Sequence, residues 1–134
     1  MRFMMLVKAS KESEAGVMPS EKALADMAKY NEELVKAGVL LDLSGLQSSA
    51  KGARVTFSRG KPRVTDGPFT EAKDGYWLIQ VKSKEEAVEW AKRVPFDEGQ
   101  VEVRQLFELD DFAPGAAVEH HRRVGKELEK KAKR

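Results

Sequence analysis

The order of strand and helix signals is the feature that most constrains this fold. Apolar and alternating stretches predict four strands, at residues 2–8, 39–44, 75–82 and 100–109. One helix is expected between the first two strands and another between the last two. A hairpin that turns at Arg59-Gly60 is expected between the two halves. This order predicts an α+β fold of the ferredoxin-like, split βαβ type with an inserted hairpin.

Capping residues mark the ends of both expected helices. Ser20 is the predicted N-cap of the first helix, and Gly38 ends it. Ser83 and Glu86 have the spacing of a capping box for the second helix, which Pro95 stops. The inner stripe of the first helix is predicted at Leu24, Met27, Ala28, Leu34 and Val35.

The first and third strands are apolar on both faces. In residues 2–8, one face carries Phe3, Met5 and Val7 and the other carries Met4 and Leu6. Two helices can cover only one face of such a sheet, and strands that are apolar on both faces are typical of sheets covered on two sides. We therefore expect a second copy of the chain on the bare face, giving a homodimer with its sheets packed face to face.

The composition fits one globular domain and excludes several classes of site. The chain has 134 residues, of which 41% are hydrophobic and 34% charged. It contains no cysteine, which removes disulfides, thiolate nucleophiles and cysteine-based zinc sites. No apolar run approaches the roughly 20 residues of a membrane span, and residues 1–10 alternate like a strand rather than a cleaved leader. A cytoplasmic protein without a membrane partner is expected.

The basic residues are concentrated at the end of the chain. Of the 24 lysines and arginines, seven follow Glu119, which leaves 17 basic and 19 acidic residues in the body of the protein. The body is therefore slightly acidic, and a nucleic-acid partner is not expected. Since the last predicted strand ends at residue 109, we expect a domain over residues 1–109 and a charged helix or tail over residues 110–134.

The segment at residues 65–77, TDGPFTEAKDGYW, does not fit ordinary hairpin-turn chemistry. Asp66-Gly67 would suit a two-residue turn, but Pro68 has no N–H with which to close it. We interpret this segment as a stiffened approach to the third strand that places one carboxylate and one aromatic ring, Phe69.

These residues resemble the signature of the DGPF proteins, which belong to the YCII-related group of dimeric α/β-barrel proteins. The resemblance rests on Asp66-Gly67-Pro68-Phe69 with Glu71 and Lys73. It extends to the blocks ELVKAGVLL (33–41), GLQSS (45–49) and VKSKEEAVEWAKRVP (81–95). It covers roughly residues 1–109 and implies a homodimer with a cleft near the signature. It implies no particular reaction. Some DGPF proteins are associated with extracytoplasmic-function sigma factors, so it also implies a regulatory protein partner as an alternative.

The chain departs from that signature close to the implied cleft. Ala72 and Asp74 replace the usual residues, the connection to the third strand is short, and Ser48 stands where the family pattern has proline.

Five residues are candidates for binding or chemistry: Asp66, Glu71, Lys73, Arg54 and Asn31. Asp66 is the catalytic candidate, as an acid, base or ligand acceptor; the alternative is a loop cap that accepts backbone N–H groups. Glu71 and Lys73 either line the cleft or form a surface ion-pair cluster. Arg54 either binds an anionic ligand or pairs across strands. Asn31 is either a satisfied amide or a donor facing the cleft.

No cofactor or metal signal accompanies these candidates. The body lacks histidine, since His120 and His121 lie in the basic tail, and no phosphate-binding glycine loop or serine elbow is present. The sequence therefore predicts a homodimeric protein that binds a small molecule near the signature and could be an enzyme of unknown reaction. The alternative is a non-catalytic regulatory module that acts through protein partners.

Overall fold

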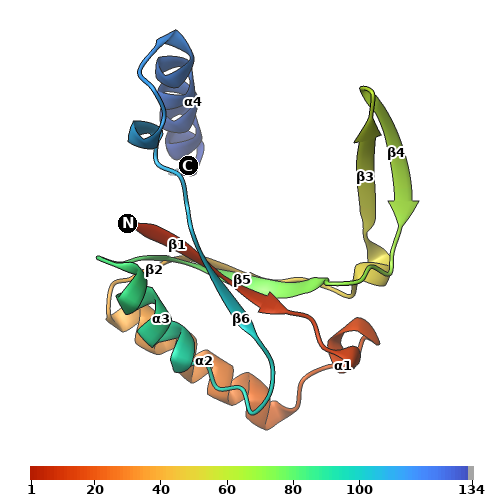
Figure 1. Cartoon of the computed structure of the whole chain (residues 1–134). Coiled ribbons are helices and arrows are strands. Elements are labelled where there is room, and N and C mark those ends of the chain that lie inside the picture. Colours follow the sequence, from red (N-terminus) through yellow and green to blue (C-terminus); the bar gives the residue numbers. More distant parts are fainter. Residues whose placement is uncertain (133–134) are drawn as a thin grey trace.

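The structure is a computed structural model that describes residues 1–132. Its centre is a four-stranded antiparallel sheet in the order β2–β5–β1–β6. The strands are β1 (Arg2–Lys8), β2 (Leu40–Gly45), β5 (Lys73–Gln80) and β6 (Val101–Gln105). Helices α2 (Glu21–Lys36) and α3 (Lys84–Lys92) lie along one face of this sheet (Figure 1). The predicted α+β, ferredoxin-like fold is confirmed.

The dimeric barrel implied by the resemblance concerns two chains. Within residues 1–132 the sheet does not close into a barrel, and its two outer strands are β2 and β6. The assembly of two copies therefore stays a prediction.

The helices begin where the capping residues indicated. Ser20 Oγ accepts from Ala23 N at 3.1 Å, and Ser83 Oγ accepts from Glu86 N at 3.1 Å. The capping box forms only in part, because the Glu86 carboxylate accepts from Lys82 N at 2.9 Å. The Glu86 side chain therefore satisfies the backbone N–H of Lys82, the residue before the N-cap.

The core lies between the sheet and the two helices. The deepest large side chains are Phe3, Met5, Leu34 and Ile79. Tyr30 packs edge-on against Trp77 with ring centroids 5.4 Å apart. The Tyr30 hydroxyl donates to the Trp90 carbonyl at 2.7 Å, and burial raises the pKa of Tyr30 to about 12.

The inner stripe of α2 is narrower than predicted. Leu24 and Val35 are exposed, and the buried residues of the helix are Tyr30 and Leu34, with Met27 packed partly against them. The prediction missed Tyr30, because the contact is made by an aromatic ring whose hydroxyl finds a carbonyl on α3. Ala28, which also belongs to the predicted stripe, is exposed as well.

The opposite face of the sheet is not covered by these helices. Met4 and Leu6 on β1, and Tyr76 and Leu78 on β5, are half-buried, while their neighbours along each strand are buried. Because side chains alternate between the faces of a strand, these four residues mark the open face.

Two further elements stand away from the open face (Figure 1). The predicted hairpin is confirmed as β3 (Ala53–Ser58) and β4 (Lys61–Asp66), a separate two-stranded sheet. Its turn, Arg59-Gly60, has positive φ at both residues, as tight hairpins require. At the other end of the sheet, the charged tail forms helix α4 (Ala116–Ala132), whereas Lys133 and Arg134 lie outside the described residues.

Three short helices complete the chain: α1 (Lys11–Glu14), η1 (Ser49–Lys51) and η2 (Leu109–Asp111). The last strand is shorter than the predicted 100–109, because after Leu106 N donates to Arg2 O at 2.9 Å the chain leaves the sheet toward η2.

Candidate functional site

The DGPF loop, residues 66–72, is held against η1 by its glycine. Gly67 N donates to Gly52 O at 3.0 Å. A Cβ atom on Gly67 would lie 1.8 Å from the carbonyl oxygen of Ser49, so no other residue fits without a shift of the backbone. The peptide bond between Gly67 and Pro68 is cis. The glycine of the signature is thus explained by a close backbone contact.

Glu14 at the end of α1 joins three segments that lie far apart in the sequence. Its carboxylate accepts from Ser49 N at 2.9 Å and from the Ser49 hydroxyl. The same Ser49 Oγ accepts from Phe69 N at 2.9 Å, and Ser48 Oγ donates to the Glu14 carbonyl at 2.6 Å. The hydrogen bonds from Ser49 lower the pKa of Glu14 below its usual value.

A second carboxylate, Asp74, lies close to this network. Burial raises the pKa of Asp74, the negative charge of Glu14 raises it further, and a hydrogen bond with Ser13 opposes the rise. Two neighbouring carboxylates thus have pKa values that are shifted in opposite directions.

A groove of about 410 Å³ lies beside the DGPF loop, between the loop and η1. Its lining includes three cations, one carboxylate, one aromatic ring and two serines that belong to the Glu14 network: Lys51, Arg54, Lys73, Glu71, Phe69, Ser48 and Ser49. Apolar atoms make up most of the remaining surface, since Leu46 and Ala72 also face it. The lining therefore carries net positive charge around an apolar floor.

The cations of the groove are held in place by few contacts. The Arg54 guanidinium lies 4.3 Å from the centroid of the Phe69 ring, and Nη2 donates to Thr70 O at 3.0 Å. Lys51 Nζ donates to Gln47 Oε1 at 2.6 Å. Lys73 Nζ is 4.0 Å from Glu102 Oε1, a separation at which a surface pair contributes little. Each cation thus keeps donors for an incoming anion.

Three of the five predicted residues meet in this groove. Arg54, Glu71 and Lys73 line it together. Asp66 is exposed at the end of β4 and is absent from the lining, and within residues 1–132 its side chain forms no hydrogen bond. Asn31 lies on α2, where its Oδ1 accepts from Trp77 Nε1 at 2.8 Å. That contact is the satisfied amide that the sequence left open as an alternative.

Sequence reasoning did not single out Glu14, Ser49 or the role of Ser48. Glu14 lies 34 and 35 residues before its serine partners, and only the folded chain shows this contact. Ser48 offered the one available signal, since it replaces a proline of the family pattern and its hydroxyl makes a hydrogen bond that proline cannot.

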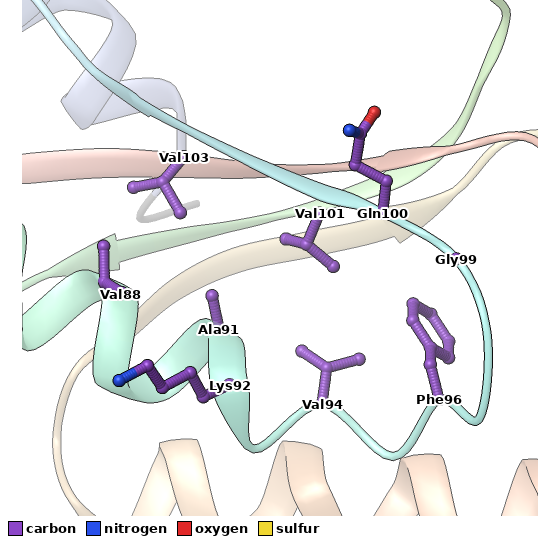
Figure 2. A pocket seen from close by; sticks show the side chains of 9 residues that line it. All are labelled: Val88, Ala91, Lys92, Val94, Phe96, Gly99, Gln100, Val101 and Val103. Carbon is purple, nitrogen blue, oxygen red and sulfur yellow. The ribbon is translucent and has the colours of Figure 1, made fainter.

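A second groove, of about 390 Å³, lies between α3 and the outer strand β6. Figure 2 shows Val101 and Val103 of β6 pointing toward Val88 and Ala91 of α3, whereas Gln100 points away. This groove offers few polar groups to orient a ligand.

The described residues, 1–132, contain neither a cluster of metal-ligating side chains nor a membrane-spanning helix. No group of three or more His, Asp or Glu side chains in that range is placed to hold a metal ion. None of the helices in the described part of the chain has the length and apolar character needed to cross a membrane.

Comparison with known proteins places the signature loop and the sheet in one family. The YCII-related domain matches residues 1–110. The chain belongs to the YCII-related family. It is also 32% identical over 75 residues to an uncharacterised protein of Rhizobium meliloti (strain 1021). That match spans 54% of this YCII-related chain and 60% of the relative. Membership of this family and similarity to this relative indicate the fold, but they assign no reaction.

Proposed function

We propose that this YCII-related protein is a homodimer that binds a small organic anion in the groove beside the DGPF loop. The observation that carries the proposal is the charge of the lining, where Lys51, Arg54 and Lys73 oppose the single carboxylate of Glu71. A groove of about 410 Å³ lies within the usual range for ligand sites, roughly 300–1,000 Å³.

The lining also indicates what kind of anion fits. Phe69 lies under the Arg54 guanidinium, so the ring and the cation together form one flat wall. A ligand with an aromatic or other planar body can lie on the apolar part of this wall. Its carboxylate or phosphate would then accept from Lys51, Arg54 and Lys73. An aromatic carboxylate is the simplest member of this class.

The homodimer is supported by the open face of the sheet. Met4, Leu6, Tyr76 and Leu78 form a half-buried apolar surface in the single chain, and a second copy packed on it would remove that surface from water. The lack of cysteine suits a reducing compartment, and we assign the protein to the cytoplasm on that ground.

Asp66 keeps its place in the proposal only as a catalytic candidate. It belongs to the same loop as Phe69 and Glu71 but is exposed at the end of β4. If the protein is an enzyme, Asp66 acts on the part of a bound molecule that projects from the groove. Asp66→Asn would then abolish turnover of an identified substrate and leave its binding intact.

Calorimetric titration with benzoate and with neutral benzamide tests the proposed binding. Benzoate is expected to bind and benzamide to bind at least tenfold more weakly, because the cations recognise the charge. Arg54→Gln should weaken benzoate binding by a similar factor. Arg63→Gln is the matched control, since Arg63 lies on the same hairpin outside the groove. Equal binding of the two probes, or an unchanged affinity in Arg54→Gln, would refute the proposal.

A further inference from the structure

The chain exposes more surface than a compact protein of its mass. Its accessible surface is 10648 Å². A compact folded monomer of 15.0 kDa has about 7,000 Å². The excess of roughly 3,600 Å² is larger than the 1,000–2,500 Å² or so that each chain of a stable homodimer buries. Figure 1 shows where the excess arises, since the hairpin and α4 both stand clear of the sheet.

The hairpin has one apolar face that nothing in the single chain covers. Val55 pairs with Val64 across the two strands, and Phe57 pairs with Pro62. Val55, Phe57 and Val64 are 52%, 70% and 65% exposed. An isolated two-stranded hairpin is at best marginally stable in water. This face therefore needs a partner surface.

Helix α4 also has apolar residues that are left uncovered in the single chain. None of its described residues is buried, and Val124 and Leu128, four residues apart on one face, are 55% and 68% exposed. An isolated helix of this length is also marginal in water. Just before it, Phe107 and Phe112 form an exposed pair with ring centroids 5.1 Å apart.

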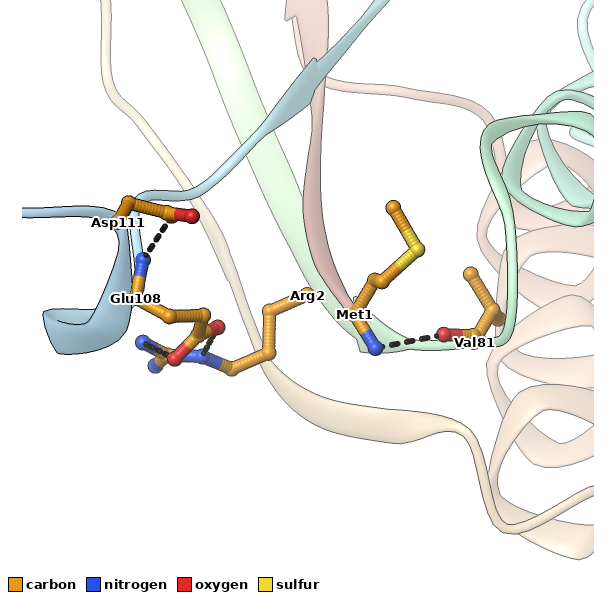
Figure 3. A network of polar contacts seen from close by, with 5 residues as sticks. All are labelled: Met1, Arg2, Val81, Glu108 and Asp111. Carbon is orange, nitrogen blue, oxygen red and sulfur yellow. Dashed lines mark hydrogen bonds and ion pairs between the residues drawn. The ribbon is translucent and has the colours of Figure 1, made fainter.

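The base of α4 is nonetheless tied to the sheet. Arg2 donates to both carboxylate oxygens of Glu108, at 2.8 and 3.1 Å, and Glu108 N donates to Asp111 Oδ2 at 2.7 Å (Figure 3). Arg122 on α4 lies 3.8 Å from Asp110. These contacts hold η2 and the start of α4 at one end of the open face. The base of the helix therefore has a fixed position relative to the sheet.

Charge distinguishes between the ways in which two copies could meet. The hairpin carries four basic residues and one acidic one: Arg54, Arg59, Lys61, Arg63 and Asp66. Two hairpins brought together would therefore repel. The segment at η2 is acidic, with Glu108, Asp110 and Asp111. The side chain of Asp110 is 95% exposed. Hairpin and η2 therefore attract each other. The described part of α4 carries five lysines and arginines against three glutamates, so its contact with the hairpin has to be made through apolar side chains.

We propose that the hairpin of each copy packs against η2 and α4 of the other copy. The proposal rests on the homodimer of the proposed function and adds this reciprocal exchange of arms. The hairpin and α4 stand at opposite ends of the open face and on the same side of it (Figure 1). Consider a two-fold axis that lies between the two sheets, parallel to them and perpendicular to the line from the hairpin to α4. Rotation about this axis packs the open faces together and places each hairpin beside α4 of the other copy. Val55, Phe57 and Val64 then bury against Val124, Leu128 and the phenylalanine pair.

Disulfide trapping tests the exchange directly, because the chain contains no cysteine. Full-length Phe57→Cys and Leu128→Cys chains, carrying different affinity tags, are mixed, allowed to exchange subunits and oxidised mildly. The mixed dimer is expected to exceed either homologous dimer at least tenfold. Thr56→Cys with Lys126→Cys is the matched control: Thr56 lies on the opposite face of its strand, and Lys126 on the opposite side of its helix.

A dissociation measurement provides an independent readout. Phe57→Ser should raise the dissociation constant of the dimer at least a hundredfold, since two phenylalanine side chains per dimer return to water. Thr56→Ser should leave it unchanged. A dimer that binds benzoate but gives no mixed disulfide and is unaffected by Phe57→Ser would overturn the arm exchange alone. So would trapping of Phe57→Cys only with itself. A monomer at 50 μM, as an approximate working concentration, would overturn both the exchange and the homodimer.

Discussion

The sheet and the DGPF region are held together by different kinds of contact. Around the sheet, apolar side chains pack into one core, and Met5, Leu34 and Ile79 are fully buried. In residues 46–72, which contain η1, the hairpin and the DGPF loop, no residue is buried. That region is joined to the rest by the hydrogen bonds of Glu14 with Ser48 and Ser49, and by two backbone bonds, from Leu46 N to Asp74 O and from Ala9 N to Ala72 O.

This difference bears on where the proposed binding site lies. A region without a core of its own opens locally at a lower free energy than the global unfolding of the domain. Binding sites are frequently built on such segments and positioned by a rigid scaffold. The groove with Arg54 and Lys73 therefore lies in a region whose equilibrium between closed and locally opened states a ligand or a second copy can shift most readily.

The largest expected effect lies in the core. Ile79→Ala should lower the free energy of unfolding by about 2–5 kcal/mol, because it removes a fully buried side chain from a packed site. Urea denaturation at fixed protein concentration measures it.

The matched control is Leu78→Ala, the next residue on β5 and on the open face. In the single chain its cost should be near 1 kcal/mol, since the side chain is only half-buried. If a second copy covers this face, the cost should increase with protein concentration. Equal costs for the two variants at all concentrations would contradict the contrast between the faces.

The same alternation explains why most of the fold could be predicted. The predicted strand 2–8 coincides with β1, and the other strands start within two residues of their predicted positions. These signals are local, since alternation and caps act over a few residues. The end of β6 and the stripe of α2 were misplaced, because both depend on long-range contacts, to Arg2 and to α3.

The second effect lies inside the DGPF region, where the loop meets η1. Gly67→Ala should cost about 1–3 kcal/mol and weaken benzoate binding, because the new Cβ would force η1 and the DGPF loop apart. Gly52→Ala is the control in the same contact, where a Cβ would meet only ordinary separations of 3.5 and 3.7 Å. Calorimetric melts combined with titration give both quantities. A Gly67→Ala protein as stable as Gly52→Ala would show that the contact is not a constraint.

The third effect separates a core role from a binding role for Asn31. Asn31→Ala should cost about 1 kcal/mol, because the buried Trp77 indole N–H loses its acceptor while water can still reach a half-exposed site. Asn31→Asp keeps an acceptor and should stay closer to the parent stability. Benzoate affinity should be unchanged in both variants. A loss of affinity with no loss of stability would instead assign Asn31 a role in ligand binding.

The candidate site was less predictable than the fold for a physical reason. Glu71 and Lys73 were found because they belong to one short signature, and Arg54 because it is a basic residue on the predicted hairpin; the structure brings all three to one groove. Glu14 and Ser49 belong to segments with no common pattern, and their contact depends on how the whole fold places α1 beside η1. A carboxylate at the end of a four-residue helix carries no signal for that contact.

The smallest effect concerns the Glu14 link between the two regions and its dependence on pH. Because hydrogen bonds from Ser49 lower the pKa of Glu14 in the folded protein below its usual 4.5, the ionised carboxylate stabilises the fold above that pH. This contribution is lost as the pH falls through the lowered value. Asp74 acts in the opposite sense: its pKa is raised, mainly by burial, so its charge opposes folding at neutral pH and that cost disappears on acidification.

Glu14→Gln isolates the first of these two contributions. At pH 7 the variant should melt at a lower temperature than the parent, since its amide cannot accept from both Ser49 groups. The difference should shrink below pH 4.5, where the parent carboxylate begins to lose its advantage. Asp74→Asn serves as the control of opposite sign and should raise the melting temperature at pH 7. If the Glu14→Gln difference stayed constant from pH 7 to pH 3, the ionised carboxylate would not be what joins α1 to the DGPF region. The shape of the Glu14 side chain, and not its charge, would then explain the contact.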